Sequence, residues 1–188
     1  MRESKPQIYD ISVAISPALV TWPGDPKPRV TVVKTIAEGG SSNLSEIAMG
    51  SHTGTHVDAP AHFADGAATI DQVPLEILVG PAKVVDMTGR AVIRAEDLRK
   101  ARVKGSTRLL LKTDNSKLWA DSTFHEKFTY IDPKAAKYIV EAGVKLVGVD
   151  YLSVDRFKSG NHPAHSALLE AGITILEGVN LAKVPAGD

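Results

Sequence analysis

The sequence of 188 residues contains no cysteine. Disulfide bonds and thiolate ligands are therefore excluded, and any metal ion must be held by imidazole and carboxylate groups. An excess of one charge is also missing, because 22 Lys and Arg residues balance 22 Asp and Glu residues. A neutral chain without runs of like charge has no field that attracts nucleic acid or an anionic membrane, so we expect neither partner.

Long apolar runs are missing as well. No stretch is long enough to span a bilayer, and the N-terminal sequence MRESKPQIYD lacks the apolar segment of a signal peptide. We therefore expect a cytoplasmic protein. Since 43% of the residues are hydrophobic, the chain can bury a core, and its length fits one domain over residues 1–188.

Hydrophobic periodicity indicates several strands in the first part of the chain. Tyr9, Ile11, Val13 and Ile15 alternate with smaller or polar residues, which predicts a strand over 9–15. Apolar or β-branched runs predict further strands at 30–33, 82–87 and 108–112, and residues 46–49 lead into a histidine-rich segment.

Helix signals appear mainly in the second half. Asp132 is a good N-cap, Pro133 suits the first helical position, and Gly143 ends the predicted helix. A second helix is expected over 163–171, a weaker one over 96–101 has no good N-cap, and strands are expected at 146–150 and 173–177. The order of these elements predicts a mixed α/β fold.

The segment SHTGTHVDAPAHF (51–63) carries three of the six histidines. Its candidate ligands, all at even positions, are His52, His56, Asp58 and His62. In an extended chain such residues share one face, and Gly54 and Pro60 oppose a helix here. A single histidine is more often an ordinary surface or core residue. Four such groups of one parity instead favour a site for a divalent cation with positions left for water.

The run HTGTHVDAPAHF resembles the signature of the cyclase-like, metal-dependent hydrolases, a family that includes bacterial kynurenine formamidase. The resemblance continues through Trp-Pro-Gly-Asp at 22–25, the approach at 43–49, the stretch GVKLVGVDYLSVD at 143–155, and the surroundings of His165 and Glu177. It implies an α/β fold of the swivelling β/β/α type, with a mixed sheet flanked by helices. It also implies a homodimer or homotetramer.

The same resemblance assigns roles to individual residues. The implied metal ligands are His52, His56, Asp58, His165 and Glu177. Asp58 would bridge two ions, His62 would donate and accept protons, and Trp22 would contact an aromatic substrate. One or two divalent ions are expected in each subunit, with zinc first and manganese also compatible. Relatives usually continue with a further strand and a Gly-rich tail, so an end at Asp188 indicates either a shorter relative or a truncated chain that lacks this strand.

The activity implied by the resemblance is hydrolysis of an aryl formamide such as N-formylkynurenine. Two alternatives stay open: hydrolysis of a cyclic amide or another small amide or ester, and metal binding without catalysis. The presence of His62 beside the ligands favours an enzyme, because a storage site has no use for a proton shuttle. His125 and His162 are expected at the surface or behind the ligands, and Asp150 either supports a ligand or lies in a turn.

Overall fold

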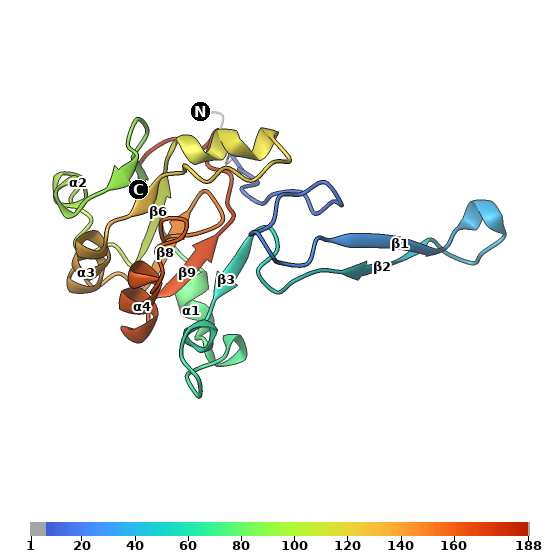
Figure 1. Ribbon diagram of the computed structural model, residues 1–188, viewed down its shortest axis with the longest axis horizontal. Helices are drawn as coiled ribbons and strands as arrows, with labels where there is room; N and C mark the ends of the chain where they lie inside the picture. Colours follow the sequence, from blue (N-terminus) through green and yellow to red (C-terminus); the bar gives the residue numbers. More distant parts are fainter. Residues whose placement is uncertain (1–6, 188) are drawn as a thin grey trace, which may run out of the picture.

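A five-stranded mixed sheet forms the centre of the computed structural model, which describes residues 7–187 (Figure 1). The strand order is β3-β9-β8-β6-β4. The bounds are β3 (His56–Asp58), β4 (Lys83–Asp86), β6 (Arg108–Lys112), β8 (Leu146–Val149) and β9 (Thr174–Glu177). β4, β6, β8 and β9 are parallel, whereas β3 is antiparallel to β9.

Three helices lie on one side of this sheet (Figure 1). They are α2 (Ala95–Lys100), α3 (Pro133–Glu141) and α4 (Pro163–Glu170). The main core joins Leu98, Ile139 and Leu168 of the helices to alternate strand residues such as Leu109 and Ile175. Burying a side chain of this size stabilises the fold by about 1.5–3 kcal/mol. The predicted fold class, a mixed sheet flanked by helices, is confirmed.

The remaining elements are short. A hairpin is formed by β1 (Arg29–Lys34) and β2 (Leu44–Ala48), and a small parallel pair by β5 (Val92–Ile93) and β7 (Tyr130–Ile131). One further turn of helix is α1 (Leu75–Leu78), and the 3-10 turns are η1 (Ile36–Glu38), η2 (Pro60–His62), η3 (Ile70–Gln72) and η4 (Asp114–Ala120). Within residues 7–187 no helix has the length and apolar character needed to cross a membrane.

The helix signals read from the sequence are confirmed. The Asp132 carboxylate accepts a hydrogen bond from the Lys134 N–H at 2.8 Å, and Gly143 follows α3 with a φ of 80°. The weakly predicted α2 also forms. Its cap comes from inside the helix, because the Asp97 carboxylate accepts from the Arg94 N–H at 2.9 Å. The residues before α2 give no sign of this cap, because the accepting carboxylate belongs to the first turn of the helix itself.

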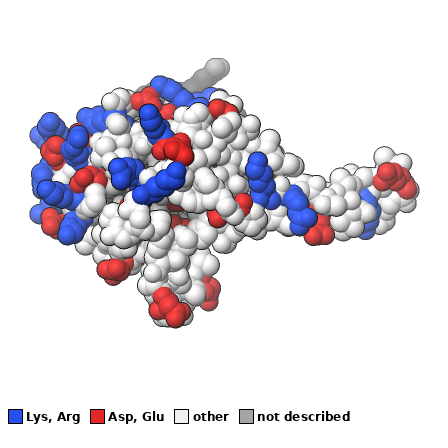
Figure 2. All heavy atoms as spheres, viewed as in Figure 1, with Lys and Arg blue, Asp and Glu red and all other residues white. Residues whose placement is uncertain are grey.

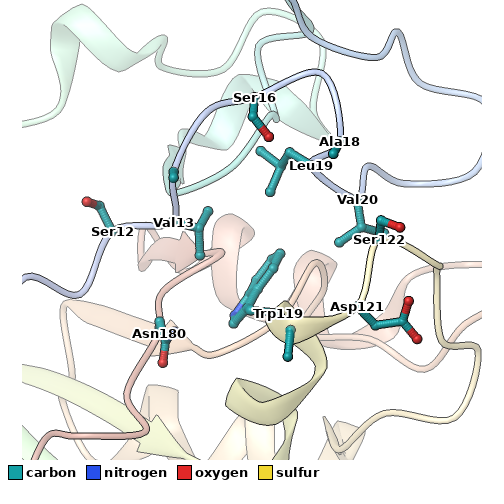
Figure 3. Close-up of a pocket in the computed structure, with 12 residues that line it drawn as sticks. Ser12, Val13, Ser16, Ala18, Leu19, Val20, Trp119, Asp121, Ser122 and Asn180 are labelled. Atoms are coloured by element: carbon teal, nitrogen blue, oxygen red, sulfur yellow. The ribbon is translucent and has the colours of Figure 1, made fainter.

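The strand predicted over 9–15 is wrong. The segment is extended, and its alternate side chains face the body, but no neighbouring strand forms a ladder with it. Single hydrogen bonds hold it instead: the Ile11 carbonyl accepts from Asn180 N–H at 2.7 Å, and Val13 N–H donates to Thr55 at 2.9 Å. Val13 faces Trp119 across a cavity of about 360 Å³ (Figure 3). The extended segment packs one of its sides against the rest of the protein. This packing explains why apolar residues alternate along 9–15 although no sheet forms there.

Asp150 stabilises the segment that follows β6. It does not contact a candidate metal ligand. Its buried carboxylate accepts hydrogen bonds from the N–H and hydroxyl groups of both Thr113 and Ser116, at 2.7–3.2 Å. These bonds tie the start of η4 to the end of β8. Neither Thr113 nor Ser116 belongs to the histidine-rich segment. These contacts therefore give Asp150 a role in the fold and not the support of a ligand.

Candidate metal centre

Pairing of β3 with β9 brings three predicted ligands onto one face. His56 lies directly opposite Glu177 in the antiparallel register, and Asp58 lies two residues further along β3. Opposite residues share a face of the sheet, and so do residues two apart in one strand. The two carboxylates and the imidazole therefore converge although Asp58 and Glu177 lie 119 positions apart in the sequence.

Two glycines allow the strands to meet closely beside these ligands. Gly178 has a φ of 74°, and a Cβ atom at this position would lie 2.0 Å from the Gly54 carbonyl oxygen. Thr55 crosses the same junction, since its hydroxyl donates to the Gly178 carbonyl at 2.6 Å. Any side chain at Gly178 would force the backbones apart, and His56 and Glu177 would separate with them.

His52 and His62 reach the same place from turns on either side of β3. The extended segment is shorter than the even-number pattern predicted, because β3 covers only 56–58 and His62 lies in η2. The two rings nevertheless stack, with centroids 3.8 Å apart and planes at 28°. His52 Nδ1 lies 2.8 Å from Asp58 Oδ1. The four groups thus converge as predicted, although turns and not one continuous strand bring them together.

His165 approaches from the first turn of α4, where Asp155 fixes it. The Asp155 carboxylate accepts from the backbone N–H groups of Ala164 and His165 at 2.8 and 3.1 Å, and it lies 2.7 Å from His165 Nδ1. With Nδ1 engaged, His165 Nε2 lies 3.6 Å from Asp58 and 3.3 Å from Glu177. Sequence reasoning missed Asp155. A carboxylate behind a ligating histidine is common, but nothing local in the sequence links it to a helix nine residues away.

The donor atoms fit a divalent cation. Candidate ligand atoms of His52, His56 and Asp58 lie within 4.8 Å of one another, as do those of Asp58, His62 and His165. In a tetrahedral site with bonds of about 2.0–2.2 Å, ligand atoms are roughly 3.3–3.6 Å apart. The His56–Asp58 separation of 3.3 Å and the His165 separations agree with that spacing.

The hydrogen bonding of His56 and Asp58 gives an independent test of the fit. His56 Nδ1 lies 3.0 Å from the Gly54 carbonyl, which directs Nε2 towards Asp58. Among the described residues, His56 Nε2 and both Asp58 oxygens are buried without a hydrogen bond of good geometry, and their near polar neighbours are donor atoms of the other candidate ligands. Buried polar atoms are rarely left in this way, because each costs about 1–3 kcal/mol. A cation between them would satisfy all three atoms.

Burial and neighbouring charges shift the pKa values of the clustered residues in different directions. Although burial favours the neutral acid, contacts with His165, His52 and His56 hold the pKa of Asp58 well below its usual range. Burial opposes charge on His165 too, but its contacts with Asp155, Asp58 and Glu177 raise its pKa well above the ordinary value. For His62, partial burial lowers the pKa to about 4. His62 is therefore a neutral imidazole at pH 7, with a lone pair free to accept a proton.

Trp22 lies elsewhere, inside an aromatic cluster. Its ring packs edge-on against Phe124 and Phe157, each 5.4 Å away between centroids, and against Phe128 at 6.4 Å. Within residues 7–187 no ring contact joins Trp22 to a histidine. Phe128 and Phe157, in turn, line a cavity of about 560 Å³.

The two remaining histidines differ in position. His125 lies 2.9 Å from the Asp121 carboxylate, with both side chains partly exposed. His162 is half-buried at the start of α4, and its ring centroid lies 6.1 Å from that of His165 and 5.0 Å from that of Phe63. His162 therefore borders the candidate metal centre, whereas His125 pairs with a neighbour at the surface.

Comparisons with known proteins agree with this architecture. Residues 9–156 match the family model described as a putative cyclase. Kynurenine formamidase of Geobacillus thermodenitrificans is 39% identical over 95% of this chain and 85% of its own length. The kynurenine formamidase of Salinibacter ruber is 40% identical over 96% and 85%. A solved structure described as a potential metal-dependent hydrolase with cyclase activity has a TM-score of 0.82 and 34% identity, covering 95% of this chain and 84% of that one. The resemblance read from the histidine-rich segment is confirmed, and the chain belongs to the cyclase family.

Proposed function

We propose that this protein is a metal-dependent amide hydrolase that cleaves aryl formamides, with N-formylkynurenine as the best candidate substrate. The observation that carries the proposal is the set of buried, unpartnered atoms on His56 and Asp58. Two relatives of 39% and 40% identity are named kynurenine formamidases, which supports the formamide as the substrate class. Hydrolysis would add water to the formyl carbon and break the C–N bond, releasing formate and an arylamine.

The ligands divide into two groups that share one carboxylate. In this proposal His52 and His56 would hold a first ion with Asp58, and His165 and Glu177 would hold a second. Asp58 would contribute to both groups, because its Oδ1 faces His52 and His56 while its Oδ2 faces His165. The donors are nitrogen and oxygen atoms, with no thiolate. Zinc is our first candidate, and manganese accepts the same types of ligand. A divalent cation at such a site supplies acidified water and polarises the scissile carbonyl.

Proton transfer is assigned to His62. Its ring stacks on His52, and burial lowers its pKa to about 4, so the imidazole is neutral at pH 7. In this proposal it takes a proton from the attacking water only transiently, because its conjugate acid releases that proton readily. The same imidazole then donates that proton to the departing amine nitrogen, which cannot leave as an anion. Asp155 contributes by position: it orients His165 through Nδ1 and keeps Nε2 towards Asp58 and Glu177.

Three properties remain predictions: zinc as the bound metal, the cytoplasm as the location, and assembly as a homodimer or homotetramer. Elemental analysis, cell fractionation and the molar mass in solution test them in that order.

The proposed function predicts release of formate from aryl formamides that depends on a divalent metal. Treatment with a chelator should abolish turnover, and added zinc or manganese should restore it. Formate is measured with the same metal-loaded protein on aryl formamides, cyclic amides and small esters. Turnover of cyclic amides alone would move the assignment to the cyclic-amide alternative. No turnover of any member, with the metal bound, would leave a metal-binding protein without this activity.

His56→Ala and Asp58→Ala should each lower the metal content, since each removes donor atoms from the proposed centre. The content is measured by elemental analysis after dialysis, together with the rate of formate release. His125→Ala is the matched control, because it removes an imidazole that pairs with Asp121 outside the cluster. Full metal occupancy in both ligand variants would disprove the assignment.

His62→Ala should reduce kcat by about 10²–10⁴, the usual contribution of a general acid–base group. Its metal content should stay close to that of the wild type, because the proposed ligands are all retained. His62 also lies within ligand distance of Asp58 and His165. Loss of metal in parallel with the rate would therefore show that it is a ligand, and the proton-transferring group would have to be another residue.

Trp22→Ala tests the expected contact with an aromatic ring. If Trp22 binds substrate, its loss should raise KM for aryl formamides by up to about tenfold, because such a contact contributes about 0.5–1.5 kcal/mol. KM for a small aliphatic formamide should barely change. The packing of Trp22 against three phenylalanines favours a different result, equal losses on both substrates with a lower Tm. That result would assign Trp22 to the fold.

A further inference from the structure

The cavity of about 560 Å³ beside η4 and β7 is a second place where a small molecule could bind. Its lining comes from residues 114–118 in η4, residues 126–130 at the start of β7, and residues 156–158. None of the candidate metal ligands lines it. Sites for small molecules usually have volumes of about 300–1,000 Å³, so this cavity has a suitable size.

The walls of this cavity are mainly apolar and aromatic. Phe128, Tyr130 and Phe157 line it, together with the aliphatic side chains of Val92 and Leu118. Contacts between aromatic rings add to the gain from burying apolar surface. Walls of this composition therefore favour a ligand with a planar aromatic ring.

Interactions within the protein shape the cavity before any ligand is bound. The Asn115 amide group donates to the Thr129 carbonyl and accepts from the Thr129 N–H, both at 2.8 Å, and so holds η4 against the start of β7. At the rim, Lys158 Nζ lies 3.5 Å from the Glu126 carboxylate and 4.8 Å from the centroid of the Phe157 ring. A preformed site loses little conformational freedom when it binds a ligand.

The two acidic residues at this cavity are already paired. Lys117 Nζ lies 2.6 Å from the Asp114 carboxylate, which also accepts a hydrogen bond from the Gly89 N–H at 2.6 Å. Glu126 pairs with Lys158 at the rim. Both negative charges are thus offset by a neighbouring lysine, and an anionic ligand would meet little repulsion from them.

Two cations at the cavity have no such partner. Lys127 and Arg156 are exposed, and the side chain of neither forms an ion pair with any of residues 7–187. Figure 2 shows basic and acidic atoms interspersed over the visible face of the body, so an excess of this kind is local. A guanidinium group presents N–H donors in the geometry that a carboxylate requires. One arginine and one lysine beside apolar walls suit a ligand with a single negative charge.

We propose that this cavity binds a small aromatic carboxylate, with the ring against the aromatic walls and the carboxylate on Arg156 and Lys127. The ring displaces water from apolar surface, and the charged group stays at the rim, where it keeps part of its hydration. The inference depends on neither the metal nor the substrate of the proposed function. Its failure would leave that function untouched.

Isothermal titration calorimetry of the full chain tests the class of ligand, with naphthoate as the probe. We expect saturable binding with a Kd on the order of 1 mM or lower, as for other ligands of this size. Naphthamide has the same ring without the charge and should bind about tenfold more weakly, because a hydrogen bond to a charged group is lost. Acetate has the charge without the ring and should show no saturable binding. Equal affinity for naphthoate and naphthamide, or no binding of naphthoate, would overturn the proposal.

Substitutions at the cavity test where naphthoate binds. Arg156→Gln should weaken naphthoate binding about tenfold and leave naphthamide binding unchanged, since it removes a charge and no part of the apolar walls. Arg102→Gln is the matched control, because Arg102 is an exposed arginine that does not line this cavity. Ala91→Trp adds a large side chain at the lining and should prevent binding of both ligands, with a Tm measurement to verify folding. Naphthoate binding that is unchanged in Arg156→Gln, or in folded Ala91→Trp, would place the ligand elsewhere and overturn the proposal.

Discussion

The Asp58 carboxylate is the group on which the candidate site depends. It is buried at the β3–β9 pair, and the polar groups near its two oxygens are the imidazoles of His52, His56 and His165. An isolated carboxylate in such a position would be very costly, and in most proteins it would become protonated. Here the surrounding nitrogen atoms hold its pKa low and keep it charged. The cluster is therefore an electrostatic unit, and removing any member changes the state of the others.

The fold serves this unit by dividing the work between two regions. The parallel strands and their three helices supply the buried core, and α4 and β9 carry His165 and Glu177 at its edge. The antiparallel β3 then adds the histidine-rich segment to that edge. Polar groups at the ends of the strands are secured in different ways. Asp150 holds backbone and hydroxyl groups of the fold, whereas Asp155 holds an imidazole of the site.

The sequence was most informative where the signal was local. Capping residues and glycines predicted α3, and the spacing of the histidines predicted that four groups converge. The residues 9–15 were misread because a period of two reports a half-buried extended chain, whether or not a neighbouring strand exists. Asp155 could not be found from the sequence, since its role arises only when the loop before α4 folds back onto the helix. Likewise, the surroundings of Trp22 depend on Phe124 and Phe157, which lie more than a hundred residues away in the chain.

The wide separation of the candidate ligands in sequence has a consequence for folding. A cation bound by side chains of β3, α4 and β9 would cross-link three distant parts of a chain that cannot form disulfides. It would bind the native state far better than the unfolded one, so resistance to heat and proteolysis would rise with the concentration of free metal. At a thousandfold excess over the dissociation constant the stabilisation is about 4 kcal/mol, close to what a disulfide contributes. The supply of metal in the cell would then set the lifetime of the protein as well as its activity.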